Sequence, residues 1–189
     1  MTAAVRKKAL RREIVTAERE MSTAEKIKAD AVIMEKLLST EEYKSAETVF
    51  CFVGTDREID TRGILTDILA AGKRLCVPRC TGAGRMEAKE ILSLAELSPG
   101  AFGIPEPPET APSVRADKID LAIVPCLSCS HTGNRLGRGG GFYDRFLKDF
   151  RGIAITLCRE KLTRDNIPTE EHDVPIPAVI TEKGIYRNG

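Results

Sequence analysis

Tryptophan is absent from the 189 residues, and aromatic residues make up only 5% of the sequence. So few aromatic rings leave little material for the stacking surfaces that bind single-stranded nucleic acids. No apolar run reaches the roughly 18 residues that a membrane-spanning helix needs. The chain turns charged at Arg6, Lys7 and Lys8, where a secretory signal would be apolar. We therefore expect no membrane partner and a cytoplasmic protein.

Net charge is nearly absent as well, because 29 Lys and Arg residues oppose 28 Asp and Glu residues and leave +1. This balance argues against a nucleic-acid partner and against a polybasic membrane anchor. The charge is unevenly distributed, however. Residues 1–20 carry six basic and three acidic side chains, and residues 131–151 carry five and two. Each segment has a surplus of +3, which favours a local anion site.

The length of the chain is that of one domain, so residues 1–189 are expected to form a single domain. A domain of this size buries about 70% of its unfolded surface and folds without a metal or a disulfide. We expect the six cysteines to be free thiols and the protein to be a monomer. One alternative is a zinc site in which Cys76 and Cys80 join Cys126 and Cys129.

Apolar residues at helical spacing fill the first forty residues and predict two helices. The first apolar stripe consists of Leu10, Ile14, Ala17 and Met21. Basic side chains one turn apart, such as Lys7 and Arg11, are either solvated or bound to an anion. Ser22 and Glu25 fit a capping box that begins the second helix. Its buried stripe is expected to consist of Ile27, Ala31, Met34 and Leu38.

Beyond residue 40, short β-rich apolar runs alternate with helical segments. The expected strands are 48–53, 75–78, 119–124 and 152–157, with weaker ones at 87–91 and 179–181. The expected helices are 61–71 and 142–150, with a helical turn at 92–97 and a proline-rich loop at 99–112. This order predicts an α/β fold with a mostly parallel sheet flanked by helices, Rossmann-like in its three α/β/α layers, and helices at the N-terminus. Ligands of such sheets bind beyond the strands' carboxyl ends, which selects the loops after Val53, Pro78, Val124 and Leu157.

Five glycines lie within nine residues, from Gly133 to Gly141. Glycine lets backbone N–H groups approach a ligand and allows the positive φ angles of an anion-binding turn. The helix expected from Phe142 points its positive dipole end at the same place, and Arg135 and Arg138 add guanidinium groups. The loop matches neither common nucleotide-binding fingerprint. It predicts a site for an anionic group such as a nucleotide phosphate; the alternative is a tight turn without a ligand.

The loop Arg135-Leu-Gly-Arg-Gly-Gly-Gly-Phe-Tyr-Asp-Arg145 resembles the signature of 5-formyltetrahydrofolate cyclo-ligases, also called methenyltetrahydrofolate synthetases. Further segments that resemble the family, in the same order, are Lys7-Lys-Ala-Leu-Arg11, Glu58-Ile-Asp-Thr61, Gly103-Ile-Pro-Glu-Pro107 and Glu171-His-Asp173. The resemblance implies a ligase that uses ATP and Mg²⁺ to close 5-formyltetrahydrofolate to 5,10-methenyltetrahydrofolate, releasing ADP and phosphate. It also implies a route in which a phosphorylated formyl group, an iminophosphate, is attacked by the folate nitrogen N10.

The resemblance also assigns roles to individual residues. Those expected to bind ATP are Lys7, Lys8, Arg11, Arg135, Leu136, Gly137, Arg138, Gly139, Gly140, Gly141, Phe142 and Tyr143. Those expected to bind the folate are Val53, Glu58, Glu106, Arg138, Gly139, Gly140, Gly141 and Phe142. Arg138 and Tyr143 are expected to be catalytic, and Asp144 and Asp173 to hold Mg²⁺ through carboxylate oxygens. The alternative for the carboxylates is a helix cap or a surface position.

One stretch departs from the family pattern. Where the family has a glycine, an aromatic residue and an aspartate before the loop, this sequence has Cys126, Cys129 and Ser130. The change bears on folate packing and on loop orientation, but it leaves the phosphate-binding glycines in place. It keeps a second function open, that of a non-catalytic relative that binds nucleotide, folate or RNA.

Overall fold

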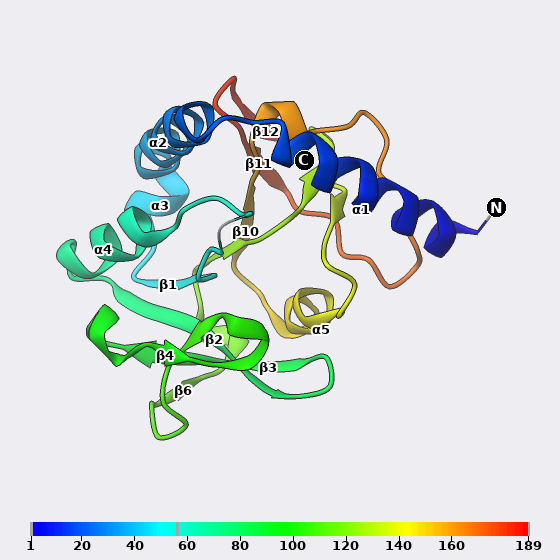
Figure 1. The fold of residues 1–189 in the computed structure, drawn as a ribbon. Helices are drawn as coiled ribbons and strands as arrows, with labels where there is room; N and C mark the ends of the chain where they lie inside the picture. Colours follow the sequence, from blue (N-terminus) through cyan, green and yellow to red (C-terminus); the bar gives the residue numbers. More distant parts are fainter. Residues whose placement is uncertain (1, 56, 189) are drawn as a thin grey trace.

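The computed structural model describes residues 2–55 and 57–188, with an eight-stranded sheet at its centre (Figure 1). The strands in spatial order are β12 (Ile185–Arg187), β11 (Ala178–Ile180), β10 (Ile153–Leu157), β7 (Leu121–Val124), β1 (Thr48–Cys51), β2 (Arg74–Gly82), β3 (Arg85–Ile91) and β6 (Ser113–Val114). The strands from β11 to β2 are parallel, whereas β12, β3 and β6 pair antiparallel with their inner neighbours. The predicted mostly parallel sheet is confirmed.

Alternate residues of the central strands face two separate hydrophobic cores. Val49 and Leu121 pack into one core, whereas Phe50 and Ala122 pack into the other. All four side chains are fully buried. Because both faces of these strands are covered, their sequences are continuous apolar runs rather than alternating ones.

Helices cover both faces of the sheet, which confirms the three layers (Figure 1). One face carries α2 (Thr23–Ser39), α3 (Glu41–Ser45) and α4 (Arg62–Ala70), and the other carries α5 (Phe142–Asp149). The N-terminal helix α1 (Ala3–Arg19) packs on a third cluster built largely from the segments after β7 and β10. Helix α1 therefore lies over the carboxyl ends of these strands. Among the described residues, no helix combines the length and the apolar character that a bilayer crossing requires.

The start of α2 follows the predicted capping box. Ser22 Oγ accepts the Glu25 N–H at 3.2 Å, and the Ser22 N–H donates to Glu25 Oε2 at 2.7 Å. In the preceding helix, Ile14 and Met21 of the predicted stripe are buried. Local sequence signals therefore locate both helices correctly.

The predicted buried face of α2 is wrong in its first half. Ile27 is 65% exposed and Ala31 is also exposed. The residues of α2 that are buried are Ala29, Ile33 and Leu37. Both sets repeat at helical spacing, so the period alone does not distinguish them. Packing against the sheet and the neighbouring helices selects the second set.

Several short elements have no counterpart among the sequence predictions. The hairpin of β8 (Ser128–Cys129) and β9 (Arg135–Leu136) includes the first residues of the glycine loop, and β4 (Ser98–Pro99) pairs with β5 (Pro105–Glu106) at the predicted loop 99–112. Of the 3₁₀ turns, η1 (Leu94–Glu96) confirms the helical turn predicted at 92–97, whereas η2 (Ala101–Gly103), η3 (Ala116–Lys118) and η4 (Glu160–Leu162) have no predicted counterpart. Elements of two or three residues are too short to show a period.

The capping box predicts an effect on stability. Ser22→Ala removes the acceptor of the Glu25 N–H and is expected to lower the free energy of unfolding by about 1 kcal/mol. Denaturant titration measures this change. Ser39→Ala is the matched control, since Ser39 is an exposed serine in the same helix, and it should cost less than about 0.5 kcal/mol. Equal effects from the two variants would contradict a role for the cap.

Candidate functional site

A cavity of about 730 Å³ opens beyond the carboxyl ends of β1 and β7, beside Pro78 and Cys80 in the middle of β2. Its lining joins segments that are far apart in the sequence, namely α1, the ends of these strands, the glycine loop and the stretch 170–173. The loops after β1 and β7 contribute to it as predicted, and the connection after β10 contributes through the stretch 170–173. Strand β2 continues to Gly82, so Pro78 and Cys80 line the cavity from within the strand and not from a loop after Pro78. Its volume falls in the range of about 300–1,000 Å³ that is typical of ligand sites.

Almost every predicted site residue lies in the lining of this cavity. These residues are Lys7, Arg11, Val53, Glu58, Glu106, Arg135, Leu136, Gly137, Arg138, Gly139, Gly140, Gly141, Phe142, Tyr143, Asp144 and Asp173. The exception is Lys8, which is exposed on α1 outside the lining. Successive helical residues point about 100° apart, so a helix that turns Lys7 inward turns Lys8 away. The position of Lys8 therefore gives no support to its predicted role.

The glycine loop adopts backbone conformations that favour glycine. Gly139 and Gly141 have φ angles of 98° and 68°, in the left-handed region. Gly141 is the N-cap of α5 and offers no side-chain cap, so the first N–H groups of the helix stay available to a ligand. At the other end of the loop, Arg11 Nε donates to the Gly137 carbonyl at 2.8 Å. The local geometry suits the predicted anion site.

Arg138 reaches from the glycine loop to the loop that follows β1. Its Nε donates to Glu58 Oε1 at 3.2 Å, and its Nη2 donates to Thr55 Oγ1 at 2.6 Å. The Glu58 side chain is only 8% exposed, and its second oxygen accepts the Thr55 hydroxyl at 2.9 Å. Arg138, which is expected to bind phosphate, therefore pairs with Glu58, which is expected to bind the folate.

Lys7 joins α1 to the segment between η4 and β11. Its Nζ donates to Asp173 Oδ2 at 2.6 Å and to Glu170 Oε2 at 2.8 Å. Burial favours a lower pKa for Lys7, but these hydrogen bonds and charges outweigh it and raise the pKa. Burial likewise opposes ionisation of Asp173, but hydrogen bonds from Lys7 and from the Glu170 N–H lower its pKa. Both partners are therefore charged near neutral pH.

Asp144 on α5 pairs with Arg135 on β9. Arg135 Nη2 donates to Asp144 Oδ1 at 2.8 Å, and the Val174 N–H donates to the same oxygen at 3.3 Å. Because Val174 follows Asp173 in the chain, the two predicted Mg²⁺ ligands come from adjoining segments. Burial raises the pKa of the neighbouring Tyr143, so this phenol is a neutral hydrogen-bond donor and not a base at neutral pH.

Arg159 fixes the loop that carries Glu58, although no sequence pattern indicates it. The residue is 3% exposed, and its guanidinium donates to both Asp30 carboxylate oxygens, at 2.7 and 2.8 Å. Its Nη2 also donates to the Glu58 carbonyl at 2.8 Å. Arg159 therefore links α2, the end of β10 and the Glu58 loop. Its aspartate partner is 129 residues away, so no local spacing reveals the pair.

An apolar wall completes the cavity, and no sequence pattern predicts it. Its residues are Phe52, Pro78, Met86, Phe102, Ile104 and Leu127. Phe102 is 78% exposed and lies edge-on to Phe142, with ring centroids 6.1 Å apart. Glu106 is buried in the lining and accepts the Cys80 N–H at 3.2 Å. The wall comes from separate segments, so only the folded chain groups these residues.

The stretch that departs from the family pattern forms the β8–β9 hairpin. Ser130 closes its turn, since the Ser130 N–H donates to the Asn134 carbonyl at 2.8 Å and its hydroxyl accepts the Asn134 N–H at 3.2 Å. The serine therefore still orients the strand that leads into the glycine loop. Cys126 lines the cavity, whereas Cys129 is fully buried.

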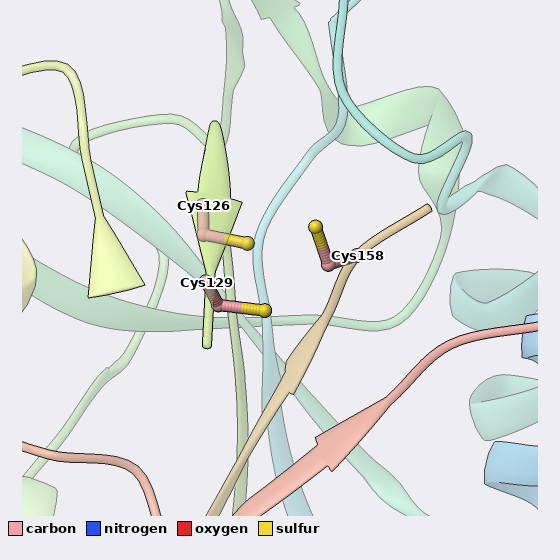
Figure 2. A group of neighbouring side chains, drawn as sticks. All are labelled: Cys126, Cys129 and Cys158. Carbon is pink, nitrogen blue, oxygen red and sulfur yellow. The ribbon is translucent and has the colours of Figure 1, made fainter. Parts of the chain in front are cut away.

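The structure does not bring together the four cysteines of the alternative zinc site. Cys76 belongs to the core beneath α5, where burial raises its pKa to about 12. The sulfur atoms of Cys126 and Cys129 lie instead beside that of Cys158, within 4.8 Å of one another (Figure 2). Hydrogen bonds from Cys129 and Cys158 lower the pKa of Cys126, and the charge of Arg135 adds to this effect.

Comparison with known sequences agrees with the motifs in the cavity. The sequence model of the 5-formyltetrahydrofolate cyclo-ligase family matches residues 3–182. The 5-formyltetrahydrofolate cyclo-ligase of Mus musculus is 26% identical, over 93% of both chains. That of Escherichia coli strain K12 is 30% identical over 75% of this chain and 81% of its own. That of Mycolicibacterium smegmatis is 34% identical over 74% of this chain and 75% of its own.

Solved structures share the fold. A 5,10-methenyltetrahydrofolate synthetase from Aquifex aeolicus is similar with a TM-score of 0.86 and 28% identity, over 96% of this chain and 92% of its own. A synthetase of the same name from Mycoplasma pneumoniae shares the fold at 19% identity, with a TM-score of 0.75 over 93% and 98% of the two chains. Because the sequence match spans nearly the whole chain, the chain belongs to the 5-formyltetrahydrofolate cyclo-ligase family.

Proposed function

We propose that this chain catalyses the closure of 5-formyltetrahydrofolate to 5,10-methenyltetrahydrofolate, using Mg²⁺ and ATP and releasing ADP and phosphate. The observation that carries the proposal is a single cavity in which a glycine loop with arginines meets an apolar wall with Glu58 and Glu106. Such a space offers surroundings for a polyphosphate and for a folate together. Membership of the family supports the same activity. All six cysteines are free, which suits the reducing cytoplasm in which we place the protein.

The reaction requires activation of the formyl oxygen, which is a poor leaving group. Transfer of the γ-phosphoryl group of ATP to this oxygen gives an iminophosphate. The N10 nitrogen then attacks the formyl carbon and releases its proton to solvent, the bond from carbon to the phosphorylated oxygen breaks, and phosphate departs with both electrons of that bond. Phosphoryl transfer needs positioning and charge neutralisation more than covalent participation by the protein.

The residues of the cavity suit these two requirements. The N–H groups from Gly139 to Gly141 would hold the phosphates, and Arg138 would neutralise charge on the transferred group. In the structure Arg138 pairs with Glu58. On substrate binding this ion pair would separate, and each residue would bind one of the two substrates. Phosphate oxygens would accept from Arg138, and donors of the pterin ring would bind Glu58. Tyr143, as a neutral phenol, would donate a hydrogen bond to a substrate oxygen.

The carboxylates in the cavity fit the Mg²⁺ ion that the family implies. Asp144 uses Oδ1, and Asp173 uses Oδ2, for partners within the chain. The other oxygen of each accepts no hydrogen bond from the described residues, and such hard oxygens suit a cation that keeps several waters. Mg²⁺ held there would neutralise charge on the phosphates. Arg135 and Lys7 hold the two carboxylates in orientation.

The alternative is a relative that binds nucleotide, folate or RNA without turnover. The altered segment from Cys126 to Ser130 favours this alternative, because it lies beside the cavity and departs from the family pattern. The hairpin that this segment forms is intact and closed by Ser130, which weakens the case for a non-catalytic relative.

Turnover separates the two functions. The full chain with 5-formyltetrahydrofolate and Mg-ATP is expected to produce the methenyl product and stoichiometric ADP, measured by near-ultraviolet absorbance and by a nucleotide assay. Omission of Mg²⁺ is the control and should stop both signals. Calorimetric binding of ATP or of the folate without ADP release, across a range of metals and pH, would establish the binding module instead.

Removal of Arg138 tests its assigned charge neutralisation. Arg138→Ala is expected to lower kcat about 100-fold, the usual cost of losing one donor to developing charge. Arg115→Ala is the matched control, because Arg115 also pairs with a carboxylate, that of Asp117, but lies outside this cavity. Steady-state kinetics on both variants measure the difference. A full kcat and KM in Arg138→Ala would refute the assignment.

Asp144→Asn tests the proposed Mg²⁺ site. The change keeps the size of the side chain but removes its charge, and it should raise the Mg²⁺ concentration needed for half-maximal rate at least about tenfold. Asp149→Asn serves as the control, since Asp149 is an exposed aspartate at the end of the same helix. Circular dichroism verifies folding of both variants. An unchanged Mg²⁺ dependence in Asp144→Asn would rule out this carboxylate as a ligand.

A further inference from the structure

Three cysteines that the proposed reaction does not use converge in the fold. Cys126 follows β7, Cys129 lies in β8 and Cys158 follows β10. Their sulfur atoms all lie within 4.8 Å of one another, and Figure 2 shows the three side chains directed toward a shared space. Because the residues come from two separate segments, their convergence is a product of tertiary structure.

The donor set consists of sulfur alone. In the part of the chain that the structure describes, this group of mutually close donor atoms contains no histidine nitrogen and no carboxylate oxygen. Cys129 is 0% exposed and Cys158 is 3% exposed. Their packing neighbours include the apolar side chains of Ile14, Leu136 and Leu162. Thiolates select soft d¹⁰ ions such as Zn²⁺ and Cu⁺, whereas Mg²⁺ prefers oxygen.

The spacing suits a shared metal ion better than a disulfide. With metal–sulfur bonds of about 2.3 Å, trigonal or tetrahedral coordination places two sulfurs roughly 3.8–4.0 Å apart. Sulfurs that already lie within 4.8 Å therefore reach such an arrangement by small shifts. A disulfide requires about 2.05 Å and would leave the third thiol unused.

Arg135 supplies a positive charge beside the cysteines. It pairs with Cys129 across the β8–β9 ladder and is 9% exposed. Its Nε–H is buried and has no acceptor among the described residues. Binding of either ion by three thiols releases three protons to solvent and leaves a net charge of −1 on the Zn²⁺ complex and of −2 on the Cu⁺ complex. The guanidinium, which also pairs with Asp144, offsets part of that charge, and its free Nε–H can donate to a thiolate.

The cavity gives an ion access to the three cysteines. Cys126 is only partly buried and lines the cavity, whereas the other two cysteines lie deeper. An ion arriving through the cavity would therefore meet Cys126 first. Once bound, it would fix the segment between β7 and β8, which is part of the cavity wall.

We propose that Cys126, Cys129 and Cys158 form a thiolate site for a soft d¹⁰ metal ion, Zn²⁺ or Cu⁺. The site is separate from the carboxylates proposed for Mg²⁺ and does not depend on the cyclo-ligase reaction.

Metal titration of the full chain tests the site. The reduced, metal-free protein is titrated separately with Zn²⁺ and with Cu⁺ in competition with a chromophoric chelator, and one ion per chain is expected for at least one metal. Co²⁺, as a spectroscopic substitute for Zn²⁺, should give thiolate-to-metal absorption in the near ultraviolet. Cys129→Ser and Cys158→Ser should each weaken binding at least about tenfold. The matched control is Cys76→Ala, which alters a buried cysteine outside the group and should leave the affinity unchanged.

The two titrations distinguish the ions, and the variants locate the site. The proposal would be overturned if neither Zn²⁺ nor Cu⁺ bound stoichiometrically. It would also be overturned if Cys76→Ala lowered the metal affinity as much as Cys129→Ser and Cys158→Ser do. If the deeper variants do not fold, Cys126→Ser replaces them, because Cys126 is only partly buried. In that case the metal should raise the unfolding temperature of the unaltered chain and not that of Cys126→Ser. An equal rise in both would also overturn the proposal.

Discussion

The candidate site depends on the buried guanidinium of Arg159. It pairs with both oxygens of Asp30 and also donates to the Glu58 carbonyl. A buried charge is tolerated only when it is paired and hydrogen-bonded, because an unpaired one costs several kcal/mol. This requirement fixes the loop after β1 against α2 and the end of β10. The same loop presents the Glu58 carboxylate to Arg138, so the two sides of the cavity are held in relation to each other through this pair.

Two further cations organise the opposite side of the cavity. Lys7 ties α1 to Asp173, and Arg135 ties the β8–β9 hairpin to Asp144 on α5. These cations belong to the two segments with surplus positive charge, and their carboxylate partners all line the same cavity. A chain with a net charge of only +1 can therefore carry a local anion site. The opposing charges hold the walls in place, while Arg138 remains 48% exposed at the cavity.

Much of the architecture was predictable because long elements repeat their pattern. The N-terminal helices, the capping box at Ser22 and the order of strands and helices all follow from local signals. The glycine loop also contains most of its own functional residues within one short stretch. Prediction failed where two patterns overlapped, as with Ile27 and Ile33 in α2, or where elements were too short, as in the β8–β9 hairpin. The buried Arg159 and the exposed Phe102 give no signal at all, since their partners lie elsewhere in the chain.

The sequence by itself determined the α/β class, the positions of the main elements and the ordered motifs that resemble one family. These features arise from residues within a few positions of each other, whose spacing is fixed by the chain. Only the tertiary structure decided that Lys7 rather than Lys8 enters the cavity. It alone decided that Cys158, and not Cys76, joins the cysteines of the hairpin. Which of these residues come together depends on how distant segments pack. The stable packing is the one that avoids the free-energy cost of burying an unpaired charge or an unpaired polar group.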